Sequence, residues 1–219
     1  MDASVRYLRQ YDLLDPEKHK MPITVIGAGA TGSFTVLGLA KMGFNNITVY
    51  DEDRVEEHNF PTQFFPTNSL GENKAEALKR LVKDFTDIDI TAKPIFYTKE
   101  ILSGVVVSAL DSMSGRQLIL DNCMKNRSNI ELLIDPRAGA EIFRVLSVKL
   151  NNSTVLKKYK STIHTDEQSD PIPCTARAIV YSVFLLAGVI ANQIKRHVMG
   201  QELKSDILID VSSHFFYTK

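Results

Sequence analysis

Short apolar runs along the 219-residue chain alternate with longer amphipathic stretches. The apolar runs are rich in valine and isoleucine, as buried strands are, and they predict strands at 22–26, 47–51, 88–93, 104–109 and 131–134. Apolar residues three and four positions apart predict helices at 31–42, 73–84, 112–126 and 175–199. This alternation predicts an α/β fold, a doubly wound and mostly parallel sheet with helices on both faces.

After Asp135 the pattern changes. Residues 140–150 alternate in polarity like a half-buried strand, which we expect to run antiparallel to its neighbour. Residues 207–210 and 214–217 predict a closing pair of strands. Residues 160–174 form a long polar loop, and such loops inside compact domains are usually functional or disordered. We therefore expect one domain over 1–219, with antiparallel strands extending the sheet at its C-terminal end.

Composition excludes several classes of protein. Hydrophobic residues make up 44% of the chain, which is enough for a sizeable core. The 26 basic and 26 acidic residues cancel, so neither nucleic acid nor an anionic membrane is an expected partner. The polar N-terminus and an apolar stretch (178–191) shorter than the ~20 residues of a membrane span predict a soluble, cytoplasmic protein. Two cysteines cannot form a four-thiolate zinc site, so no zinc is expected.

A glycine-rich turn follows the first predicted strand. Gly27, Gly29 and Gly32 form a G-x-G-x-x-G motif that leads into a helix, and Asp51 ends the next strand about twenty residues later. The first glycine permits a tight turn, the second lets backbone approach a phosphate, and the third allows close helix packing. Asp51 would accept hydrogen bonds from ribose hydroxyls, or it is a solvated carboxylate at a strand end.

Polar residues beyond this turn point to more than dinucleotide binding: Asp53, Asn59, Gln63, Lys74 and Asp111. Lys74, at the start of a predicted helix, suits phosphate as a point charge, and its alternative is a solvated helix lysine. Asp111 ends a predicted central strand, where doubly wound sheets bind ligands, and its alternative is a helix N-cap.

The order and spacing of these blocks resemble the ThiF/MoeB/HesA family, within the superfamily of ubiquitin-activating enzymes. The blocks are Asp51-x-Asp53-x-Val55 with Asn59 and Gln63, Gly71-x-x-Lys74-Ala75, Val105–Ser112 with Arg116, and Arg6-Tyr7-Leu8-Arg9-Gln10. Together they extend over nearly the whole chain.

The resemblance implies ATP-dependent adenylation of the C-terminal glycine carboxylate of a ubiquitin-like or sulfur-carrier protein, with release of pyrophosphate. It implies ATP and Mg²⁺, with Asp111 as the magnesium carboxylate and with Asn59 and Gln63 contacting phosphates and adenylate. Arg9 would reach the phosphates of the other subunit, which implies a homodimer, and Arg116 would order the Asp111 turn. Residues 1–135 would be the nucleotide-binding half, and 136–219, with the crossover loop 160–174, the half for substrate and dimer contacts.

One position departs from the family pattern. Thr62 stands where the family has an arginine before the glutamine, and threonine cannot supply charge to a phosphate. Either Arg9, Lys74 and Arg54 suffice, or the protein is a non-catalytic nucleotide-binding subunit of a partner complex. An NAD-dependent oxidoreductase would explain Gly27 to Asp51 but leaves Lys74 and Asp111 without roles. A small or tRNA-linked carboxylate is an alternative substrate.

The second half holds further candidates. Cys174, at the start of the predicted helix, is either an acyl acceptor like the cysteine of ubiquitin-activating enzymes or a half-buried structural residue. Residues 135–139 either shape the floor of a substrate channel or form a simple turn. Cys123 and the stripe of Val180, Phe184, Ala187, Ile190, Ala191 and Ile194 are predicted to be core.

Overall fold

The structure is a computed structural model that describes residues 3–164 and 178–219. Its single sheet has the strand order β3-β2-β1-β4-β5-β6-β7-β8. The strands are β1 (Ile23–Ile26), β2 (Ile47–Tyr50), β3 (Thr91–Lys93), β4 (Gly104–Ser108), β5 (Ile130–Gly139), β6 (Ile142–Val148), β7 (Asp206–Asp210) and β8 (Phe215–Thr218). Strands β1 to β5 pair in parallel and β6 to β8 are antiparallel, which confirms the predicted fold class.

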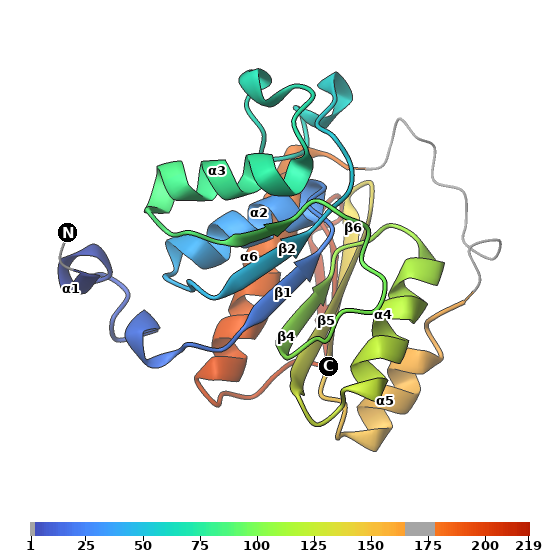
Figure 1. Cartoon of the computed structure of the whole chain (residues 1–219). Coiled ribbons are helices and arrows are strands. Elements are labelled where there is room, and N and C mark those ends of the chain that lie inside the picture. The colour runs from blue at the N-terminus through green and yellow to red at the C-terminus, as the bar shows by residue number, and fades with distance from the viewer. Residues whose placement is uncertain (1–2, 165–177) are drawn as a thin grey trace.

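Helices cover both faces of this sheet. The helices of the described residues are α1 (Ala3–Arg6), which lies away from the sheet, α2 (Ala30–Lys41), α3 (Lys74–Thr86), α4 (Met113–Lys125), α5 (Ser153–Lys160) and α6 (Val180–Val198), with short 3-10 turns at Pro16–Lys18, Glu57–Asn59 and Thr67–Ser69. Figure 1 shows α2, α3 and α6 on one face and α4 and α5 on the other. None of the helices described here is long and apolar enough to cross a membrane.

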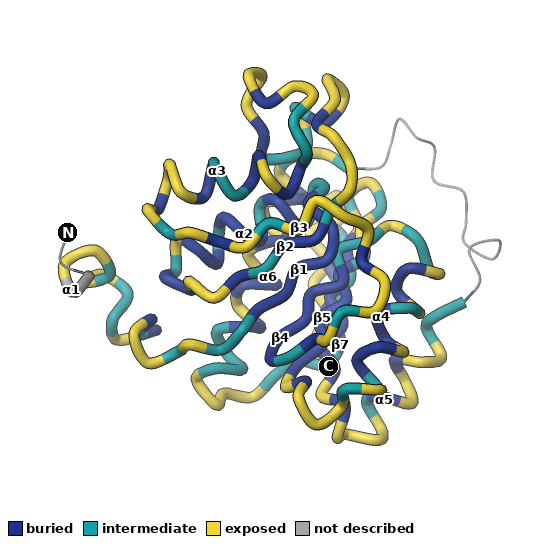
Figure 2. The backbone as a smooth tube through the Cα atoms, in the orientation of Figure 1, coloured by how far each residue is buried: buried dark blue, intermediate teal, exposed yellow. Residues whose placement is uncertain are grey.

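Two apolar cores, one on each face, fix the sheet. Every residue of β1 and β4 is buried, which explains why their sequences are continuous apolar runs rather than alternating ones. Figure 2 shows these buried central strands between helices whose outer faces are exposed. Cys123 is fully buried in the α4–α5 core, as predicted, and burial raises the pKa of its thiol to about 12.

Two features of the second half differ from the sequence-based expectation. Residues 135–139 are not a turn, because β5 continues to Gly139 and pairs with β6. The sequence 153–160, which gave no helix prediction, forms α5, capped by Asn152 and anchored by buried Leu156 and Tyr159.

The stripe on α6 is only partly core. Ala187, Ile190, Ala191 and Ile194 are buried and Val180 is half-buried, but the prediction is wrong for Phe184, which is 55% exposed. Phe184 stacks edge-on against Phe34 of α2 and lines an apolar groove between α2 and α6 with a volume of about 770 Å³.

Candidate functional site

The glycine turn lies at the carboxyl end of β1 and begins α2. Gly27 has a φ of +101°, and a Cβ there would meet the carbonyl oxygen of Ala109 at 2.5 Å. A Cβ on Gly32 would overlap the carbonyl oxygen of Gly27, so this helix must pack directly on the turn. A Cβ on Gly29 would meet nothing within 4 Å. The open space therefore lies above Gly29, at the N-terminus of α2.

That helix N-terminus is suited to an anion. Gly29 is the N-cap of α2 and has no side chain to satisfy the first backbone N–H groups. The helix dipole adds a partial positive charge at the same point. The turn thus combines room for a ligand with N–H donors that can bind a phosphate.

Asp51 lies beside the turn and supports it. Its Oδ2 accepts a hydrogen bond from Ala28 N at 2.6 Å, and its Oδ1 accepts one from Asp53 N at 2.8 Å. Burial raises the pKa of Asp51, while these two backbone donors and the charge of Lys74 lower it. One carboxylate therefore joins the glycine turn to the loop that follows β2, and its oxygens keep further lone pairs for a ligand.

The loop after β2 brings Asp53 and Lys74 together. Lys74 Nζ lies 2.9 Å from Asp53 Oδ2, and the Lys74 side chain is only 10% exposed. Asn73 caps α3 by accepting hydrogen bonds from Ala75 N and Glu76 N. Its own amide group donates to the carbonyl oxygens of Asp51 and Asp53. Lys74 is therefore a held cation beside Asp51 rather than a solvated helix lysine.

Asn59 and Gln63 occupy the same loop in different ways. Asn59 is buried, and its Oδ1 accepts a hydrogen bond from Glu56 N in a reciprocal cap. Gln63 Oε1 is buried and has no hydrogen-bond partner among the described residues. An orphaned amide oxygen of this kind is costly unless a ligand or water satisfies it. Contact of either residue with a nucleotide remains a prediction.

The missing arginine at Thr62 is not replaced by Arg54. The guanidinium of Arg54 donates to the carbonyl oxygen of Gly71 at 2.7 Å, within the loop itself. Thr62 N donates to the carbonyl oxygen of Asn59. Of the cations considered from the sequence, Lys74 is the one that this loop brings to the site within a single chain.

Asp111 follows β4 at the same edge of the sheet as the glycine turn, and it is exposed. The N-cap of α4 is Ser112, so the alternative role of Asp111 as that cap is excluded. Buried Arg116 donates to the carbonyl oxygens of Ser108, at 3.3 Å, and Leu110, and so holds the Asp111 turn as expected.

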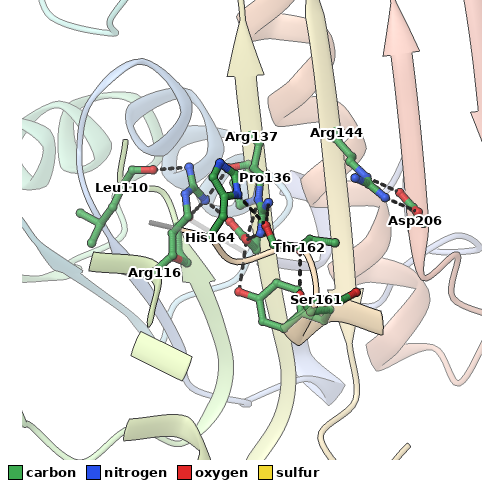
Figure 3. Close-up of polar contacts among 12 residues, drawn as sticks. Leu110, Arg116, Pro136, Arg137, Arg144, Ser161, Thr162, His164 and Asp206 are labelled. Carbon is green, nitrogen blue, oxygen red and sulfur yellow. Dashed lines mark hydrogen bonds and ion pairs between the residues drawn. The ribbon is translucent and has the colours of Figure 1, made fainter. Parts of the chain in front are cut away.

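A buried charge network lies next to this turn, and the sequence did not reveal it (Figure 3). Arg116 and Arg137 both pair with the fully buried Asp135, and Tyr159 donates to the same carboxylate at 3.1 Å. Burial, followed by the charge of Arg137, lowers the pKa of Arg116 to about 10. The sequence signals this network only through the polar Asp-Pro-Arg (135–137) that follows an apolar strand. The packing of α4 and α5 buries these residues, and the sequence pattern does not show that packing.

Two residues predicted for the site, Arg9 and Cys174, are not placed at this edge. Gln10 Nε2, next to Arg9, donates to the carbonyl oxygen of Met42 at the C-terminal end of α2. Twelve helical residues, about 18 Å, separate that end from the glycine turn. Cys174 lies outside the described residues. Nor does any group of three His, Cys, Asp or Glu side chains in 3–164 and 178–219 have metal-site geometry.

The comparisons with known proteins come from sequence and from fold. The model of the ThiF family matches residues 17–210. The NEDD8-activating enzyme E1 catalytic subunit of Arabidopsis thaliana is 33% identical over 116 residues, which cover 49% of this chain and 25% of that protein. The tRNA threonylcarbamoyladenosine dehydratase of Bacillus subtilis is 26% identical over 112 residues, 47% of this chain and 44% of that protein. The chain thus spans less than half of each relative.

A solved structure of E. coli MccB with AMPCPP and MccA shares the fold. Its TM-score is 0.75 at 16% identity, covering 100% of this chain and 72% of that one. The family match extends over most of the chain and includes the glycine turn, the loop after β2 and the Asp111 turn. The chain belongs to the ThiF family.

Proposed function

We propose that the protein adenylates a carboxylate with ATP. The carrying observation is the shared edge of the sheet. It holds an open glycine turn at a helix N-terminus, the Asp51 carboxylate beside it, the buried Lys74 cation, and the exposed Asp111. Membership of the ThiF family and the Arabidopsis relative, a NEDD8-activating enzyme subunit, support the same activity.

Each group has a role in that reaction. Asp51 binds the ribose, and the N–H groups above Gly29 bind phosphate, with Lys74 neutralising charge. Asp111 would hold Mg²⁺, which neutralises the leaving phosphates. The substrate carboxylate oxygen attacks the α-phosphorus, the bond to the β-phosphate oxygen breaks, and pyrophosphate leaves. Asn59 and Gln63 would complete the site, with the free Gln63 oxygen as an acceptor.

The proposed substrate is the C-terminal glycine of a ubiquitin-like or sulfur-carrier protein. A tRNA-linked carboxylate is the alternative, favoured by the Bacillus relative, a tRNA threonylcarbamoyladenosine dehydratase. The balance of 26 basic and 26 acidic residues favours the protein substrate, because tRNA binding requires a positive surface.

Two further parts of the proposal concern the second half of the chain. Cys174 would take the acyl group as a thioester, releasing AMP. A second copy would cover the apolar groove between α2 and α6 and bring its Arg9 to this subunit's phosphates. The groove supports this dimer because Gln10 and Leu13, which follow Arg9 in the chain, line it together with exposed Phe184.

A non-catalytic subunit is the competing function, and the observation for it is Thr62. The loop supplies no cation in place of the family arginine, since Arg54 binds Gly71. Such a protein would bind nucleotide weakly and act only in complex with a partner. An oxidoreductase is disfavoured because the Lys74–Asp53 pair serves no hydride transfer.

Pyrophosphate–ATP exchange tests the proposal. The protein is incubated with labelled pyrophosphate, Mg-ATP and either a carrier protein ending in Gly-Gly or the same carrier lacking those two residues. We expect label in ATP with the intact carrier only. Exchange with neither carrier, while Mg-ATP still binds, would remove the carrier-activation claim and favour the non-catalytic subunit.

A further inference from the structure

One buried carboxylate connects two surfaces at the edge of the sheet. Asp135 Oδ1 accepts from Arg116, whereas Oδ2 accepts from Arg137 Nε at 3.0 Å and Nη2 at 2.8 Å. Tyr159 of α5 also donates to Oδ2. The two oxygens therefore bind different arginines, and the loss of one arginine leaves the other paired.

The two arginines lead to different segments. Arg116 holds the Asp111 turn through the carbonyl oxygens of Ser108 and Leu110. Arg137 instead reaches the chain just after α5, where Nη1 donates to Thr162 O at 2.8 Å and Nη2 to Thr162 Oγ1 at 3.0 Å. Figure 3 shows Arg116, Arg137, Thr162 and His164 lying close together.

We propose that Arg137 is a positioning residue that sets the distance between residues 161–164 and the Asp111 turn, and thereby the approach of the carboxylate substrate to that turn. This inference rests on the proposed function. Arg137 itself is mostly buried and its donors serve Asp135 and Thr162, so it acts through those partners. Ala140, directly after the end of β5, also forms a backbone bridge with Ala178, just before α6.

The charges of this cluster balance once the Asp111 turn is counted. Two guanidinium groups share the carboxylate of Asp135, and the exposed carboxylate of Asp111 offsets the remaining positive charge. Tyr159 adds no negative charge, since burial raises its pKa to about 12. Arg137 therefore acts on this edge through geometry, by binding Asp135 and Thr162 together.

Hydrogen–deuterium exchange tests the positioning without any substrate. In the Arg137→Met variant we expect faster exchange of the amides of 159–164, where Thr162 N and Ile163 N are bonded to Tyr159 and Lys160. Amides of 108–112 should keep their protection because Arg116 still binds Asp135. Arg116→Met should show the reverse pattern. Arg80→Met is the matched control, because Arg80 of α3 pairs with Glu72 on the opposite face of the sheet and should affect neither segment selectively.

Kinetics test the functional consequence. For Arg137→Met in pyrophosphate exchange with a Gly-Gly carrier, we expect the KM for the carrier to rise about tenfold and the KM for ATP to stay within about twofold. An equal rise in both, or unchanged exchange at 159–164, would overturn the inference. If wild type gives no pyrophosphate exchange, the proposed function fails, and the deuterium pattern alone decides whether Arg137 positions the segment.

Discussion

Two glycines three residues apart have separate roles at the glycine turn. Gly29 borders open space, whereas Gly32 lies against the backbone of Gly27. A methyl group at the first position would occupy the space that we propose for a phosphate, and at the second it would displace the helix. Substitution by alanine at Gly29 should therefore affect ligand binding, whereas substitution by alanine at Gly32 should affect folding.

We predict that Gly29→Ala keeps the fold but loses most of the stabilisation by Mg-ATP, with affinity at least tenfold lower, about 1.4 kcal/mol. Gly32→Ala should lower the free energy of unfolding by about 2 kcal/mol or more through overpacking. Urea unfolding with and without Mg-ATP measures both. Unaltered ATP stabilisation in Gly29→Ala would argue against a phosphate above this residue.

Lys74 is the cation that a single chain brings to this site, so its removal is the sharpest residue-scale test of charge. Lys74→Met should lower the rate of pyrophosphate exchange by about 10²-fold, as loss of a transition-state charge does. Lys83→Met is the control, because Lys83 also pairs with aspartates, Asp87 and Asp89, but does so at the C-terminal end of α3, away from this site. Similar rates in the two variants would contradict a role for Lys74.

At the scale of elements, the sequence predicted strand positions well and their lengths poorly. Strand β5 extends past Pro136 because β4 pairs with it only as far as Ile134, so the missing N–H of proline faces no neighbouring strand there. The proline and glycine of 135–139 are local turn signals, and pairing with β6 outweighs them. Helix α5 has eight residues, too few to be stable alone, and its burial against β6 determines it.

A salt-bridge cluster attaches α5 to the antiparallel strands. Asp206 of β7 binds Arg144 of β6 through two bonds of 2.7 Å and Lys158 of α5 at 2.7 Å. Hydrogen bonds from Arg144, the largest cause, and from Lys158 lower the pKa of Asp206 to about 2, although burial opposes them. A carboxyl group whose pKa is depressed on folding stabilises the protein above its unfolded pKa.

We therefore predict that Asp206→Asn lowers the free energy of unfolding by about 1–2 kcal/mol at pH 7, a range that allows for the partly exposed partners. The difference from wild type should shrink as pH falls from about 4 towards 2, since wild type then loses the same charge. Urea unfolding across this pH range measures it. An equal difference at pH 7 and pH 2 would show that the charge is not responsible.

For the whole molecule, the order of strands and helices followed from alternation, and the glycine turn indicated the edge of the sheet that we propose binds nucleotide. The sequence did not reveal how polar residues pair across the fold. Asp135 and Arg137 lie two residues apart on β5, but Arg116 of α4 and Tyr159 of α5 reach this carboxylate only through tertiary packing. Phe184 belongs to the apolar stripe of α6 by its spacing, yet it packs against Phe34 of α2 with about half of its surface exposed. Such contacts depend on tertiary packing, which local periodicity does not encode.

The proposed dimer makes a prediction at this scale. Phe184→Asp places a charge in the groove between α2 and α6, so sedimentation should show a monomer where wild type is a dimer. Phe216→Asp, on exposed β8, is the control and should leave the association state unchanged. A wild-type monomer at micromolar concentration, or a dimer that persists in Phe184→Asp, would contradict this interface.

The proposed function requires that the carboxyl edge of the sheet bind ATP. Isothermal titration calorimetry of the wild-type protein with Mg-ATP, and separately with NADH, measures this binding. We expect saturable binding of Mg-ATP that Gly29→Ala weakens at least tenfold, about 1.4 kcal/mol, and no binding of NADH. Binding of NADH but not Mg-ATP, or Mg-ATP binding that Gly29→Ala leaves unchanged, would contradict it.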